Sequence, residues 1–118
     1  MKKYFLTFSL ILLLSSCDSS TYESLEEPQI IEGNATYDAN VKSIIDGNCI
    51  VCHSLGGSAS FRPLTTFAEV RNAVLNTNLL ERIHLQNGEP GQMPQSGRMS
   101  QDKINTIIKW NSDGLLEN

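Results

Sequence analysis

The chain has 118 residues, which is enough for one small domain. It carries thirteen acidic and nine basic residues, a formal net charge of −4 at pH 7, and the basic patch of a nucleic-acid-binding protein is missing. Composition and charge therefore argue against a nucleic-acid partner. A domain of this size buries a limited core, and such domains often need a covalent or metal cross-link to be stable.

The N-terminus has the features of a targeting signal. Two lysines follow the first methionine, and the apolar run at residues 4–14 is too short to span a bilayer. The sequence LSSC at residues 14–17 resembles the lipobox of bacterial lipoproteins, whose signal is cut before a cysteine that then receives a diacylglycerol. The resemblance implies a signal peptide over residues 1–16 and a lipid on Cys17.

An ordinary secretory signal with an unmodified cysteine is the alternative at this position. Both signals predict a protein outside the cytoplasm. The lipobox further predicts a lipoprotein anchored to a membrane on the periplasmic side of the cell envelope. Two or more acyl chains are enough to hold a protein stably on a membrane.

Residues 17–35 are predicted to form the lipidated N-terminus and a flexible acidic linker. They are rich in acidic residues and serines, and neither a helical nor a strand period runs through them. A flexible chain of this length has a root-mean-square span of about 20–25 Å. Such a linker would let a domain at residues 36–118 move close to the membrane.

The predicted domain begins with an amphipathic helix. Four apolar residues follow the i, i+4, i+7, i+8 spacing of one helical face: Tyr37, Val41, Ile44 and Ile45. Thr36 is placed to cap the start of this helix, and Gly47-Asn48 is placed to end it. The helix therefore leads directly into a pair of cysteines.

Residues 49–53 have the sequence CIVCH, which is the attachment signature of a c-type haem. Cys49 and Cys52 can each add across a vinyl group of the porphyrin, and His53 can then reach the iron as an axial ligand. The alternatives are a thioredoxin-like redox pair, half of a zinc site and a simple disulfide. No βαβ pattern supports the first and no second cysteine pair supports the zinc site, so the adjacent histidine favours haem.

Three further helices are predicted before the C-terminus, and no stretch predicts a convincing strand. The first begins after Thr65 or Thr66, the second covers residues 79–85, and the third begins after Ser100 and stops at Gly114. The predicted fold class is therefore all-α.

A long loop at residues 87–100 separates the last two of these helices. It is rich in turn signals, and a loop of this length in a small domain is usually functional. Met93 lies in its middle, and a thioether is a soft ligand that suits haem iron. Met93 is therefore predicted as the second axial ligand. Met99 and His84 are the alternative donors, and a gap-filling core position is the alternative role for Met93.

The CIVCH motif is followed about forty residues later by Met93-Pro94 and then by a tryptophan-containing helix. In that order, these elements resemble a small monohaem cytochrome c domain over about residues 36–116. The resemblance implies a cytochrome c-like small helical domain wrapped around one covalently attached haem c. It also implies that a proline carbonyl, here that of Pro63, accepts a hydrogen bond from the second ring nitrogen of His53.

The predicted function is one-electron transfer, with Cys49 and Cys52 as covalent haem attachments and His53 and Met93 as the axial ligands of the iron. An iron with both axial positions filled leaves no site for a substrate, so an electron carrier is expected and not an enzyme. Its partners would be other redox proteins near the membrane. Two alternatives stay open: haem-based small-molecule binding or catalysis with a labile sixth ligand, and a structural lipoprotein.

Overall fold

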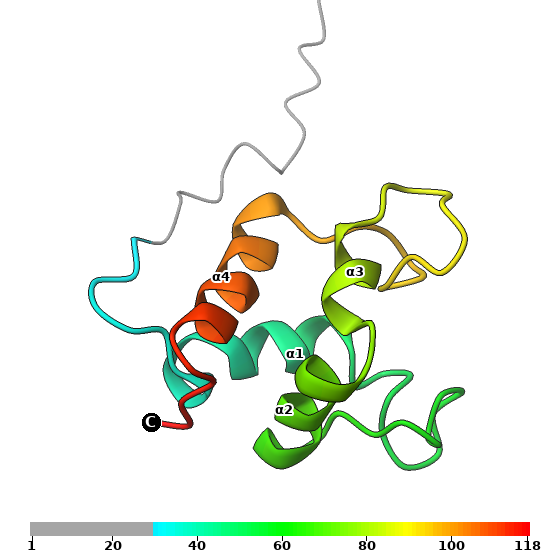
Figure 1. The fold of residues 1–118 in the computed structure, drawn as a ribbon. Coiled ribbons are helices and arrows are strands. Elements are labelled where there is room, and N and C mark those ends of the chain that lie inside the picture. The colour runs from blue at the N-terminus through cyan, green and yellow to red at the C-terminus, as the bar shows by residue number, and fades with distance from the viewer. Residues whose placement is uncertain (1–29) are drawn as a thin grey trace, which may run out of the picture.

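The computed structural model describes residues 30–118, in which helices alternate with two long loops (Figure 1). The helices are η2 (Tyr37–Val41), α1 (Lys42–Asn48), α2 (Phe67–Asn76), α3 (Leu79–His84) and α4 (Gln101–Ser112). Within these residues there is no strand, and one isolated parallel bridge joins Thr36 to Leu116. The predicted signal peptide at residues 1–16 and most of the predicted linker lie outside the described residues. Nothing in residues 30–118 forms a helix with the length and apolar character needed to cross a membrane.

The predicted N-terminal helix is present and consists of two segments. Thr36 caps it as predicted, because its hydroxyl accepts a hydrogen bond from the backbone N–H of Ala39 (3.4 Å). The first segment, η2, is a π-helical turn in which Lys42 N–H donates to the carbonyl of Tyr37, five residues earlier. The second segment, α1, ends at Asn48. The apolar spacing did not predict the π-helical turn of η2. Its buried residues, Tyr37 and Val41, fit the apolar face of a continuous α-helix equally well.

The two ends of the described chain are held together. Tyr37 N–H donates to the carbonyl of Leu116 (2.9 Å), and Ala35 N–H donates to the carboxylate of Asp113 (2.6 Å). The side chain of Ala35 is fully buried. Packing of the domain therefore includes a residue that precedes Thr36, and this residue is fastened to the end of α4.

An aromatic cluster joins three of the helices. The ring centroid of Tyr37 lies 5.5 Å from that of Phe67 and 5.8 Å from that of Trp110, and the Phe67 and Trp110 centroids are 6.3 Å apart. Trp110 is fully buried, and its indole N–H donates to the carbonyl of Leu116 (2.8 Å). This cluster fixes α4 against η2 and the start of α2, and α4 also contacts α3 (Figure 1).

The start of α2 is fixed by a capping box. The hydroxyl of Thr66 accepts a hydrogen bond from Glu69 N–H (3.3 Å), and the Glu69 carboxylate accepts one from Thr66 N–H (3.0 Å). The same carboxylate accepts hydrogen bonds from the backbone N–H (2.8 Å) and hydroxyl (2.9 Å) of Thr65. The predicted cap at Thr66 is confirmed, and Thr65 supports it from the preceding position.

Glu69 is expected to make stability depend on pH. The hydrogen bonds from Thr65 and Thr66 hold its pKa below the ordinary value of 4.5, because they stabilise the charged carboxylate. The stability it contributes is thus present above the ordinary pKa and lost as pH falls through the lowered one. We expect Glu69→Gln to lower the free energy of unfolding at neutral pH. In strong acid, where the Glu69 carboxylate of the wild type is protonated, the two proteins should be equally stable. Denaturant titrations across this range measure the effect. Glu81→Gln, at an exposed position of α3, is the control, and parallel profiles for wild type and Glu69→Gln would contradict the prediction.

Candidate functional site

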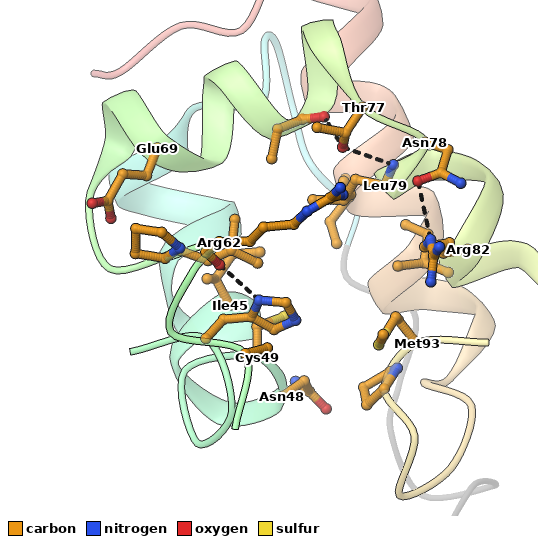
Figure 2. Close-up of a pocket in the computed structure, with 18 of the residues that line it drawn as sticks. Ile45, Asn48, Cys49, Arg62, Glu69, Thr77, Asn78, Leu79, Arg82 and Met93 are labelled. Atoms are coloured by element: carbon orange, nitrogen blue, oxygen red, sulfur yellow. Dashed lines mark hydrogen bonds between the residues drawn. The ribbon is translucent and has the colours of Figure 1, made fainter. Parts of the chain in front are cut away.

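A cavity of about 520 Å³ lies among the end of α1, the loop after it, α2, α3 and the loop before α4 (Figure 2). This volume is within the range of about 300–1,000 Å³ that is typical of ligand and cofactor sites. Most of its lining residues are apolar, and they include Ile45, Leu64, Leu79, Ile83, Met99 and Ile107. The cavity is therefore suited to a largely apolar occupant.

The CIVCH motif forms a tight turn directly after α1. Cys49 N–H donates to the carbonyl of Ile45 (2.8 Å), and both Cys52 N–H (3.2 Å) and His53 N–H (3.0 Å) donate to the carbonyl of Cys49. Cys49 and His53 line the cavity, whereas Cys52 is exposed and is not part of the lining. The two thiols are not joined by a disulfide. The turn thus brings one of the two cysteines and the histidine to the cavity wall.

The environment of Cys49 does not favour a redox thiol pair. Burial raises the pKa of the Cys49 thiol to about 11, so that it stays protonated at neutral pH. Reactive redox cysteines instead have a lowered pKa, because the thiolate is the nucleophile. A thioredoxin-like pair and a zinc thiolate both need a deprotonated cysteine, so this thiol fits neither of these alternatives well.

The imidazole of His53 is oriented by a backbone carbonyl. Its Nδ1 lies 2.7 Å from the carbonyl oxygen of Arg62, marked by a dashed line in Figure 2. Because a carbonyl only accepts, Nδ1 carries the proton and the neutral ring keeps a lone pair on Nε2. Such a second bond also fixes a metal-binding ring and raises its basicity. The prediction that Pro63 supplies this carbonyl is wrong, because the carbonyl is that of Arg62, one residue earlier. Leu64 N–H donates to the backbone carbonyl of His53 (2.8 Å), which holds residues 62–64 alongside the histidine.

Gly57 allows the loop after the motif to pass close to Cys52. A Cβ atom at residue 57 would overlap the carbonyl oxygen of Cys52 and lie 2.7 Å from its carbonyl carbon. We therefore expect Gly57→Ala to lower the free energy of unfolding by about 1–3 kcal/mol, the usual cost of overpacking. Gly47→Ala is the control, because a Cβ there meets nothing within 4 Å and should raise stability by about 0.5–1 kcal/mol. Urea titrations measure both, and a Gly57→Ala protein as stable as wild type would refute the steric argument.

The three candidates for the second axial ligand, Met93, Met99 and His84, differ in whether they reach the cavity. Met93 and Met99 both line the cavity. Met93 is half-buried on the loop opposite Cys49, whereas Met99 is only 4% exposed and packs in the core just before α4 (Figure 2). His84 is exposed, does not line the cavity, and donates its Nδ1 proton to the carbonyl of Leu80 (2.7 Å). The cavity therefore brings His53 together with either methionine, but not with His84.

Sequence reasoning missed the polar groups at the α2–α3 junction. Thr77, Asn78 and Arg82 line the cavity on the side away from Cys49 (Figure 2). Arg82 Nε donates to Asn78 Oδ1 (3.0 Å), its Nη1 donates to the carbonyl of Gly91 (3.3 Å), and its own carbonyl accepts from Met93 N–H (3.1 Å). The spacing of Asn78 and Arg82, four residues apart on one helical face, was the only sequence signal of this contact.

The side chains at the cavity supply too few ligands to bind a metal ion without further groups. Between residues 30 and 118, no three side chains of His, Cys, Asp or Glu are grouped so that they could hold a metal ion. His53 and Met93 offer one nitrogen and one thioether sulfur to the same space. A porphyrin supplies the equatorial ligands of its own iron and takes only axial ligands from the protein, so this pair of donors fits a haem.

One comparison with known proteins identifies the N-terminus. Residues 1–17 match the prokaryotic membrane lipoprotein lipid attachment site, and this match ends at Cys17. No curated protein and no solved structure matches the chain. The predicted localisation is thereby confirmed: the protein is an exported lipoprotein, anchored by a lipid on the cell envelope.

Proposed function

We propose that this lipoprotein is a one-electron carrier that holds a single haem c in the 520 Å³ cavity. Cys49 and Cys52 are the covalent attachments, His53 is the proximal ligand of the iron, and Met93 is the distal ligand. When bound, the haem supplies the chemistry, which is the exchange of one electron between the ferric and ferrous states of its iron.

The observation that carries the proposal is the convergence of Cys49, His53 and Met93 on one apolar cavity. These residues come from the turn after α1 and from a loop some forty residues later. Two thiols for attachment, an imidazole with a bare Nε2 and a thioether are the groups that this cofactor takes from the chain, and Cys52, three residues after Cys49, supplies the second thiol from the exposed side of the same turn. A disulfide or half of a zinc site would need neither the apolar cavity nor the methionine.

Each of these residues has a distinct task in the proposed carrier. The Arg62 carbonyl holds the Nδ1 proton of His53, so that Nε2 is the atom presented to the iron. The thioether of Met93 fills the opposite position, which excludes water and small molecules from the metal. Apolar residues such as Ile83 and Ile107 surround the site and keep it dry. Electron transfer then needs no exchange of ligands and no substrate pocket.

We also propose that the domain has an all-α, cytochrome c-like fold. The support is the order of its parts: a helix that leads into CIVCH, a methionine loop, and a final helix that packs on the first. Because the lipid holds the carrier on the envelope, its redox partners are expected to be proteins at or near the same membrane.

A spectroscopic experiment on the lipoprotein extracted from membranes tests this function. We expect a pyridine haemochrome assay to give one haem per chain with the spectrum of a c-type haem, and the haem to stay with the protein under denaturing conditions. The reduced protein should be low-spin and should not bind carbon monoxide readily. A haem-free product would refute the proposal, and fast stoichiometric carbon monoxide binding would favour small-molecule binding or catalysis at an open axial position.

A further inference from the structure

Apart from the aromatic residues Tyr37 and Trp110, Gln92 is the only residue with a polar side chain that is buried within residues 30–118, with 8% of its surface exposed. It comes directly before Met93 on the loop between α3 and α4. A buried amide is costly unless its donors and acceptors are paired, so its partners show what it stabilises.

The amide of Gln92 forms hydrogen bonds on both sides of Met93. Its Oε1 accepts from Gly88 N–H (3.1 Å), and its Nε2 donates to Asn87 Oδ1 (3.1 Å) and to the carbonyl of Pro94 (3.1 Å). The orientation of the amide follows from chemistry, because Gly88 N–H can only donate and the Pro94 carbonyl can only accept. One side chain therefore ties the start of the loop to the residue that follows Met93.

Helix α3 fixes the same loop from outside. The backbone N–H of Met93 donates to the carbonyl of Arg82 (3.1 Å), and the guanidinium of Arg82 donates to the carbonyl of Gly91 (3.3 Å). These contacts attach the loop to α3 but do not set its internal shape. Inside the loop, the Gln92 amide acts together with the bond from Arg98 N–H to Asn87 Oδ1 (2.7 Å), and the amide is the group that bonds directly to the residue after Met93.

We infer that Gln92 is a positioning residue for the distal ligand: its side-chain amide holds the loop so that the Met93 sulfur faces the cavity. This inference rests on the proposed function, in which Met93 binds haem iron. A neutral thioether competes with other ligands only if it is held near the metal in advance, and groups behind a ligand supply this restraint. Loosening the loop should therefore open the axial position to a competing ligand without removing Met93.

The test compares Gln92→Glu with Gln95→Glu in the mature, haem-loaded protein. Glutamate keeps the length of the side chain and an acceptor for Gly88 N–H, but an ionised carboxylate cannot donate to Asn87 or Pro94. Gln95 is exposed on the same loop, so its replacement makes the same change of charge without these contacts. We measure the far-red absorption of the sulfur–ferric iron bond and the concentration of imidazole that displaces Met93.

We expect Gln92→Glu to weaken the far-red band. It should also lower the half-saturating imidazole concentration about tenfold or more, because the variant loses buried hydrogen bonds. Gln95→Glu should stay within about twofold of wild type, as for most surface substitutions. A purely structural role for Gln92 would lower the denaturation midpoint but leave the imidazole titration of the folded protein unchanged. Equal titrations for the two variants would overturn the inference.

A second variant covers the case in which Gln92→Glu does not mature. Asn87 is exposed, and Asn87→Ala removes one of the two acceptors of the Gln92 amide together with the bond that Arg98 N–H donates to the same oxygen (2.7 Å). We expect it to lower the half-saturating imidazole concentration by a smaller factor, and an unchanged titration would overturn the inference. A wild-type protein without the far-red band would instead show that Met93 is not the ligand, which refutes the proposed ligand set before any variant is compared.

Discussion

Replacement of Met93 by alanine is expected to convert the haem from low-spin to high-spin while the haem stays covalently attached. The thioether is the proposed distal ligand, and an alanine side chain offers no donor atom to the iron. The reduction potential should fall, because ligation by Met and His raises it relative to other ligand sets. Optical spectra of the oxidised and reduced protein, with a potentiometric titration, measure both effects.

Met99→Leu is the matched control, because Met99 lines the same cavity but is buried in the core. Leucine keeps its volume and apolar character, so the low-spin spectrum should persist and stability should change by less than about 1.5 kcal/mol. A high-spin Met99→Leu protein together with a low-spin Met93→Ala protein would transfer the ligand role to Met99. A wild-type protein that is already high-spin would contradict a filled axial position altogether.

The double variant Cys49→Ala, Cys52→Ala is expected to lose the haem and with it the cooperative unfolding transition. Without an occupant, a cavity of about 520 Å³ would lie between the end of α1 and α2 on one side and the loop that carries Met93 on the other. The domain is small, and without the haem the residues that line the cavity lose the packing contacts that the haem would make with them. We expect weak far-UV circular dichroism and a broad, non-cooperative melt, in contrast to the haem-loaded protein.

The control separates the loss of the haem from the loss of the two thiols. It is the wild-type sequence of residues 30–118 produced in the cytoplasm, where both thiols are present but c-type haem is not attached. Both haem-free proteins should behave alike if the missing cofactor is the cause. A cooperative melt of the cytoplasmic product, close to that of the mature protein, would contradict the prediction. A difference between the two would assign part of the effect to the half-buried side chain of Cys49.

Local sequence patterns were sufficient to predict the helices. Thr36 and Thr66 both cap helices, as predicted, and the apolar spacing identified the buried face of the N-terminal helix. These signals act within one or two helical turns, so they are visible without knowledge of the rest of the fold. The bridge between Thr36 and Leu116 joins opposite ends of the domain, and no local pattern could have predicted it.

The sequence predicted three residues that line the candidate site, but not the groups that support them. CIVCH and Met93 carry chemistry that is recognisable from residue type and spacing, and the fold brings Cys49, His53 and Met93 to one cavity. The support for these residues comes from backbone carbonyls and from bonds between segments, such as Arg62 with His53. A carbonyl is common to every residue, so its role depends on geometry and not on residue type.

The contact between Ala35 and Asp113 also determines where a mechanical load enters the molecule. The lipid anchor pulls on the chain through the residues that precede Ala35, and the hydrogen bond from Ala35 N–H to Asp113 passes that pull to the end of α4. None of residues 30–36 lines the cavity. A pull on the chain before Ala35 would therefore enter the domain on the side where the two ends of the described residues meet, and not through a residue of the cavity wall.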